Sequence, residues 1–145
     1  MVEENKEAPL FSKFPQVDQI GIVVKDMDTS VNFYEQMFGP PFLTLESNTN
    51  KAKLKISLFQ IGEIQFELIQ VLDGESVHSK FLREKGEGLH HVGFIVEDLE
   101  EELTRLEKEG IKVLERGIVQ EMVKFAYLDT EKRLGIILEL IQLAL

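Results

Sequence analysis

Two ten-residue stretches of this chain align with each other, Asp18-Gln19-Ile20-Gly21-Ile22-Val23-Val24-Lys25-Asp26-Met27 and His90-His91-Val92-Gly93-Phe94-Ile95-Val96-Glu97-Asp98-Leu99. Their offset of 72 residues returns near the end of each half, where Phe66-Glu67-Leu68-Ile69-Gln70 matches Leu138-Glu139-Leu140-Ile141-Gln142 at four of five positions. Chance similarity is not expected to keep one offset across two separate segments. The chain is therefore a tandem duplication of one module.

Each half has the pattern of one strand, one helix and then three strands. Residues 17–24 are rich in Ile and Val, and Asp26 is placed to cap a helix that stops at Gly39. The second half repeats this with Asp98 as the cap, Glu101 as a capping-box partner and Gly110 as the stop. Further strands are expected at about 42–47, 53–60, 63–71, 112–115, 123–128 and 135–142.

These elements predict an α+β fold in which two tandem βαβββ modules form one cupped mixed sheet. Residues 1–15 are expected to be an N-terminal tail, with Phe11 and Phe14 docking on the body. Module one spans about 16–73, a connecting helix with Val77, Phe81 and Leu82 inward spans 75–86, and module two spans about 88–143. The domain as a whole covers residues 16–145.

Composition restricts the possible functions. The chain has 145 residues, 43% of them hydrophobic, and a net charge of −10. This charge argues against nucleic acid as a partner, because phosphate binding needs clustered Lys and Arg. There is no apolar run of the roughly 18 residues that a membrane span needs, no secretory pattern at the N-terminus and no cysteine. We expect a cytoplasmic protein that uses no thiol chemistry.

Four side chains of the metal-ligand type fall on equivalent positions of the two modules. Gln19 corresponds to His91, and Glu67 corresponds to Glu139. Each is a polar residue on an otherwise apolar strand face. Burying such a side chain costs free energy unless a partner satisfies its polar atoms. A pseudo-two-fold axis between the modules would bring all four together. Their nitrogen and oxygen atoms suit one divalent metal ion, Co, Zn, Ni or Mn, although ordinary sheet residues facing solvent remain an alternative.

The other histidines are expected to lie outside this site. Because side chains alternate along a strand, His90 should point to the opposite face from His91. His78 lies on the connecting helix, where we expect it to face solvent. The cations that could meet the phosphates of coenzyme A are Lys80, Arg83, Lys85, Lys132 and Arg133, unless they are simply scattered surface charges.

The chain resembles the vicinal oxygen chelate (glyoxalase/bleomycin-resistance) superfamily, and most closely its methylmalonyl-CoA epimerases. The resemblance covers about residues 16–143 and is most specific in Gly86-Glu87-Gly88-Leu89-His90-His91. It implies paired βαβββ modules around a divalent metal held by Gln19, Glu67, His91 and Glu139. It also implies an isomerase that takes the α-proton from a small-molecule thioester. Such a reaction is helped by bases on both sides of the reacting carbon, and the symmetry-related Glu67 and Glu139 are the candidates for these catalytic bases.

Two positions depart from the epimerase pattern. Those enzymes usually have His at the position of Gln19, and their second-base glutamate falls here on Lys51, or on Glu46 if the loop is shifted. A Gln, Glu, His, Glu ligand set is similar to that of some glyoxalase I enzymes (lactoylglutathione lyases). A metal-free small-molecule binding protein of the same fold is a third possibility. A ring-cleaving dioxygenase is disfavoured, because it needs two His ligands and only one of the four is His.

We also expect a homodimer, since the outer strands of each module present unpaired backbone groups and apolar faces that need cover.

Overall fold

The computed structural model describes residues 9–11, 16–49 and 51–143. Module one contains β1 (Val17–Val23), α1 (Met27–Phe38), β2 (Leu43–Asn48), β3 (Ala52–Ile61) and β4 (Ile64–Gly74). The connecting helix α2 (Val77–Lys85) leads into module two, with β5 (Gly88–Ile95), α3 (Leu99–Lys108), β6 (Val113–Val119), β7 (Val123–Leu128), α4 (Glu131–Leu134) and β8 (Ile137–Leu143). The α+β class and the repeated strand–helix–three-strand order are confirmed.

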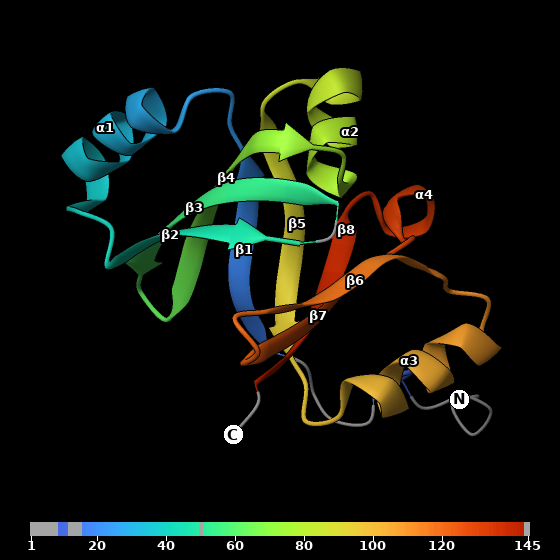
Figure 1. Cartoon of the computed structure of the whole chain (residues 1–145). Helices are drawn as coiled ribbons and strands as arrows, with labels where there is room; N and C mark the ends of the chain where they lie inside the picture. The colour runs from blue at the N-terminus through green and yellow to red at the C-terminus, as the bar shows by residue number, and fades with distance from the viewer. Residues whose placement is uncertain (1–8, 12–15, 50, 144–145) are drawn as a thin grey trace, which may run out of the picture.

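The strands form one curled eight-stranded sheet in the order β2-β3-β4-β1-β5-β8-β7-β6 (Figure 1). Within each module the first strand pairs parallel to the last, β1 with β4 and β5 with β8. The modules meet at the centre, where β1 and β5 run antiparallel. This single junction places the equivalent strands of the two modules symmetrically about the middle of the sheet.

The two long helices cover the outer face at opposite ends of the sheet (Figure 1). In module one, buried Val24, Met27, Phe59 and Leu68 form the cluster between α1 and the strands. In module two the corresponding cluster contains Leu99, Leu103, Leu106, Ala126, Leu128 and Leu140, and Phe11 packs against it. The predicted docking of Phe11 is therefore confirmed, whereas Phe14 lies outside the described residues.

The repeated glutamines explain why both helices begin where they do. The Gln70 side-chain oxygen accepts a hydrogen bond from Met27 N at 2.7 Å, and Gln142 accepts one from Leu99 N at 2.8 Å. Asp98 caps Glu101 N as predicted, at 3.1 Å, while Asp26 accepts instead from the Thr29 hydroxyl. A glutamine in the last strand of each module thus fixes the start of the helix in the same module.

Module two differs from the prediction in two details. The strand β6 is longer than expected and reaches Val119, and the short helix α4 lies between β7 and β8, where no helix was expected. Gly135 ends α4 in the left-handed conformation at φ 79°, which favours glycine. No helix in the described part of the chain is both long enough and apolar enough to cross a membrane.

Candidate metal centre

The four predicted ligand residues meet on the inner face of the curled sheet, within one chain. His91 Nε2 lies 3.1 Å from Glu139 Oε1 and 3.3 Å from Glu67 Oε1. Gln19 Nε2 donates a hydrogen bond to Glu139 Oε1 at 2.9 Å. The His91 side chain has no exposed surface, and those of Glu139 and Glu67 are 6% and 14% exposed. The central β1–β5 junction therefore brings residues 72 positions apart to one buried point.

Two glycines make room for these side chains. Gly21 is paired with His91 across the junction, and a Cβ at this position would lie 2.0 Å from His91 Cε1. Gly93 is paired with Gln19, and its Cβ would lie 2.9 Å from Gln19 Cγ. The repeat thus supplies a polar residue and a facing glycine from each module, a use of strand glycine that allows close approach. The alignment contained both glycines, but only the cross-module register shows which side chains they accommodate.

The donor atoms suit a cation. Glu67 Oε1 and His91 Nε2 are buried and form no hydrogen bond, although they are neighbours. Unpartnered buried polar atoms are costly, and a divalent ion shared by these oxygen and nitrogen atoms would satisfy both. One atom each of Glu67, His91 and Glu139 lies within 4.8 Å of the others, a spacing that could hold a metal ion.

Charges in the site oppose one another. Burial lowers the pKa of His91, but the carboxylates of Glu139 and Glu67 outweigh it and raise this pKa to about 9. Burial raises the pKa of Glu67. His91 lowers this pKa and the charge of Glu139 raises it, and the net effect is an increase. In the absence of metal, a proton on His91 thus partly compensates the two carboxylates.

The expected positions of His90 and His78 are wrong. The β1–β5 register shifts between Gly21 and Ile22, so His90 is the extra residue of a β-bulge. Its Nδ1 lies 2.8 Å from His91 Nδ1, which places both rings on the inner face. His78 is only 2% exposed, because α2 packs against β1, β4 and β5 and turns this side chain inward.

Tyr127 is a site residue that the sequence patterns missed. It pairs with Glu139 across β7 and β8, and both residues are buried. It also contacts His78 Nε2 through its hydroxyl at 3.0 Å. Burial, followed by the charge of Glu139, raises the pKa of Tyr127 well above 10. A tyrosine in a strand of apolar residues usually indicates packing, so no sequence signal singled it out.

The family follows from comparison with known proteins. Residues 18–127 match the model of the Glyoxalase/Bleomycin resistance protein/Dioxygenase superfamily. The chain belongs to this superfamily. It is 32% identical over 127 residues to the uncharacterized protein YqjC of Bacillus subtilis (strain 168), covering 86% of this chain and 90% of that protein. The uncharacterized protein YwbC of the same organism is 30% identical, covering 71% and 78%.

Solved structures of the superfamily include methylmalonyl-CoA epimerases. A single-residue variant of the Streptomyces coelicolor epimerase, in complex with 2-nitronate-propionyl-CoA, superposes with a TM-score of 0.78 at 25% identity, covering 91% of this chain and 96% of that one. An epimerase in complex with methylmalonyl-CoA and NH4+ gives a TM-score of 0.76 at 26% identity, with the same coverage.

The two candidates for the superfamily's epimerase-type second base both lie away from the centre. Glu46 is exposed and ion-paired with Lys53 at 3.4 Å, while its neighbour Leu45 packs into the cluster on the inner face. Because successive strand residues face opposite sides, Glu46 points to the outer face. Lys51 is exposed and lines a pocket beside α2.

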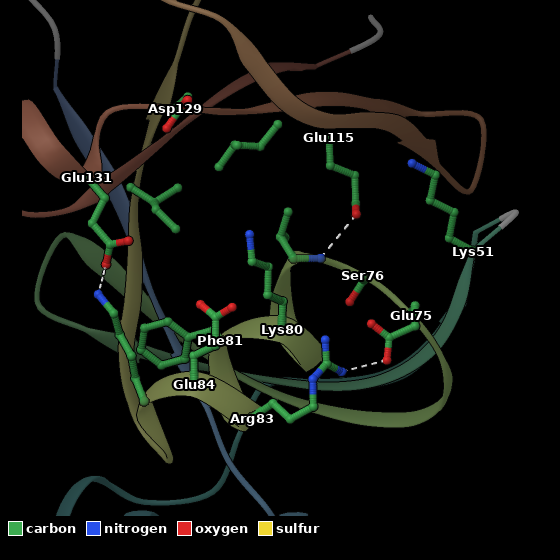
Figure 2. A pocket seen from close by; sticks show the side chains of 14 residues that line it. Lys51, Glu75, Ser76, Lys80, Phe81, Arg83, Glu84, Glu115, Asp129 and Glu131 are labelled. Atoms are coloured by element: carbon green, nitrogen blue, oxygen red, sulfur yellow. Dashed lines mark hydrogen bonds and ion pairs between the residues drawn. The ribbon is translucent and has the colours of Figure 1, made fainter.

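That pocket, of about 400 Å³, collects several of the cations considered for phosphate binding (Figure 2). Arg83 pairs with Glu75 at 2.7 Å, and Lys85 pairs with Glu131. Lys80 extends between these pairs in Figure 2. Carboxylates balance the cations here, so the pocket is not a concentrated anion site. Lys132 and Arg133 lie on the exposed surface of α4.

Proposed function

We propose that this protein is a metal-dependent isomerase that removes and returns the α-proton of an acyl-CoA thioester, most simply methylmalonyl-CoA. The observation that carries the proposal is the buried meeting of His91 with Glu67 and Glu139, whose unpartnered atoms suit a cation. The similarity to methylmalonyl-CoA epimerases, two of them solved with acyl-CoA ligands, supports this substrate class.

Gln19, Glu67, His91 and Glu139 would hold one divalent ion, Co, Zn, Ni or Mn. His91 would bind through Nε2, and Gln19 would turn its amide oxygen towards the ion. When bound, the ion would supply electrophilic stabilisation of negative charge on the thioester carbonyl oxygen.

The chain's own carboxylates would move the proton. One of Glu67 and Glu139 accepts the proton as the α-carbon–hydrogen bond breaks. The other, already protonated from solvent, gives its proton to the opposite face as a new carbon–hydrogen bond forms, and the first then releases its proton to solvent. Both carboxylates border His91 Nε2. The outward position of Glu46 leaves this pair as the candidates for two-sided proton transfer.

A lactoylglutathione lyase of the glyoxalase I type is the second candidate. The Gln, Glu, His, Glu set of candidate ligands is the feature that favours it, since epimerases usually carry His at the position equivalent to Gln19. A metal-free binding protein of the same fold is the third candidate.

The test begins with protein purified without a metal-affinity tag. We expect one divalent ion per chain by elemental analysis, and its loss from folded His91→Ala and Glu139→Ala. Methylmalonyl-CoA incubated in deuterated water should gain deuterium at the α-carbon in a metal-dependent reaction. Glu139→Gln should abolish this uptake, whereas Glu46→Gln, which alters an exposed outer carboxylate, should preserve it.

Other outcomes separate the alternatives. Conversion of the methylglyoxal–thiol hemithioacetal without labelling of methylmalonyl-CoA would establish the lyase. No reaction of either substrate with any added divalent metal would favour the binding protein. Full metal occupancy in both alanine variants would refute the ligand assignment.

A further inference from the structure

A chain of buried hydrogen bonds runs from the start of α2 to Tyr127, the residue that faces Glu139. Ser76 Oγ lies 3.2 Å from His78 Nδ1, and His78 Nε2 lies 3.0 Å from the Tyr127 hydroxyl. Tyr127 in turn is paired with Glu139 across β7 and β8. His78 and Tyr127 are 2% and 4% exposed, so water does not readily replace these partners.

The number of protons on each group determines which group donates in each of these hydrogen bonds. An ionised Glu139 can only accept a hydrogen bond, so it favours the orientation in which the single proton of the facing Tyr127 hydroxyl points towards it. Tyr127 oxygen must then accept from His78 Nε2–H. A neutral imidazole carries one N–H, which leaves His78 Nδ1 to accept from the Ser76 hydroxyl. If Tyr127 donated to His78 Nε2 instead, the lone pairs of its oxygen would face the negatively charged carboxylate, which is unfavourable.

The equivalent position in module one has no such donor. Glu139 faces Tyr127 across its strand pair, whereas Glu67 faces Leu58. Leu58 cannot donate a hydrogen bond, and Glu67 Oε1 is buried without a partner. Gln19 donates to Glu139 as well. The two carboxylates are therefore related by the repeat but held differently.

We infer that Tyr127, oriented by His78 and Ser76, is the positioning residue that holds the Glu139 carboxylate towards the metal centre. Glu139 is then the fixed carboxylate, and Glu67 is the one that reorients when substrate enters. This inference rests on the proposed function for its use in catalysis, but the hydrogen-bond chain can be tested without metal or substrate. Groups that orient metal ligands commonly change metal affinity about 10- to 100-fold when removed.

The first measurement uses metal-free protein. Nitrogen-15 NMR of labelled histidine should show His78 with its proton on Nε2, and Tyr127→Phe should shift that proton towards Nδ1. A proton on Nδ1 of His78 in the unmodified protein would overturn the inference. Failure of the proposed function would leave this spectrum unchanged, so the two failures are distinguishable.

The second measurement is a metal-competition titration. Tyr127→Phe, which removes only the hydroxyl, should weaken binding of Co²⁺ by about 10- to 100-fold. The control Phe125→Leu disturbs a neighbouring buried ring on the same strand but removes no hydroxyl, and it should bind Co²⁺ normally. His78→Leu combined with Tyr127→Phe should be no weaker than Tyr127→Phe alone, because His78 acts through Tyr127. Unchanged affinity in Tyr127→Phe, or additive losses in the double variant, would overturn the inference.

Discussion

Gly21→Ala tests the close packing at the centre most directly. The added Cβ would lie 2.0, 2.3 and 2.5 Å from Cε1, Nε2 and Nδ1 of His91. Ordinary contact starts near 3.4 Å, so the ring must retreat by about 1.4 Å. The ring has little space to do so, because it is fully buried and the Tyr127 and His90 rings lie 4.9 and 5.0 Å away, centroid to centroid.

Such a movement is large beside the 3.1 and 3.3 Å distances from His91 Nε2 to the carboxylate oxygens. We expect metal affinity to fall about 100-fold, equivalent to about 2.7 kcal/mol. Overpacking should also destabilise the fold by about 1–3 kcal/mol. Competition titration with Co²⁺ measures the affinity, and urea unfolding of the metal-free protein measures the stability separately.

Two further glycine variants calibrate this result. In Gly93→Ala the nearest atoms, Gln19 Cγ and Ile141 Cδ1, are 2.9 and 3.1 Å away, so smaller shifts suffice and the affinity loss should be smaller. Gly117→Ala crowds the Phe125 ring at 3.0 Å, away from the four ligand residues, and should affect stability without affecting metal binding. A folded Gly21→Ala protein with unchanged affinity, or a larger loss in Gly93→Ala, would refute the reasoning.

Three other predictions concern protonation, helix starts and assembly. The pKa of His91 is about 9 in the folded protein and 6.5 in an unperturbed histidine, so protonation of His91 stabilises the metal-free fold. This stabilisation is complete below about pH 6.5 and is lost as the pH rises through 9. Zn²⁺ must displace this proton, and its measured affinity should rise roughly tenfold per pH unit up to about pH 9; a flat profile would contradict this. Gln70→Ala and Gln142→Ala each remove the hydrogen bond to the first helical N–H, so each should lower the free energy of unfolding, measured in urea, by about 1 kcal/mol. An effect at only one site would show that the two caps are not equivalent. Leu114 and Ile118 are 43% and 56% exposed on the outer strand β6, so the expected homodimer should dissociate in Leu114→Glu/Ile118→Glu, while a wild-type monomer by sedimentation at micromolar concentration would contradict it.

Much of the architecture was predictable because it depends on local patterns repeated at one offset. Helix α1 begins at Met27 and α3 at Leu99, at equivalent positions of the aligned stretches. Strand alternation correctly assigned Glu67 and Glu139 to one inner face. The helix caps were less predictable, since Gln70 and Gln142 act on helices more than 40 residues earlier in the chain.

The sequence by itself determined the duplication, the α+β class and the four polar residues that the two modules contribute. Tertiary structure alone decided how those residues are surrounded. The bulge at His90, the inward turn of His78 and the contrast between Tyr127 and Leu58 all depend on pairing between strands or packing of α2. A periodic pattern specifies which face a side chain takes within a regular strand, but a bulge resets that alternation, and the residue opposite is chosen by the register of a distant segment.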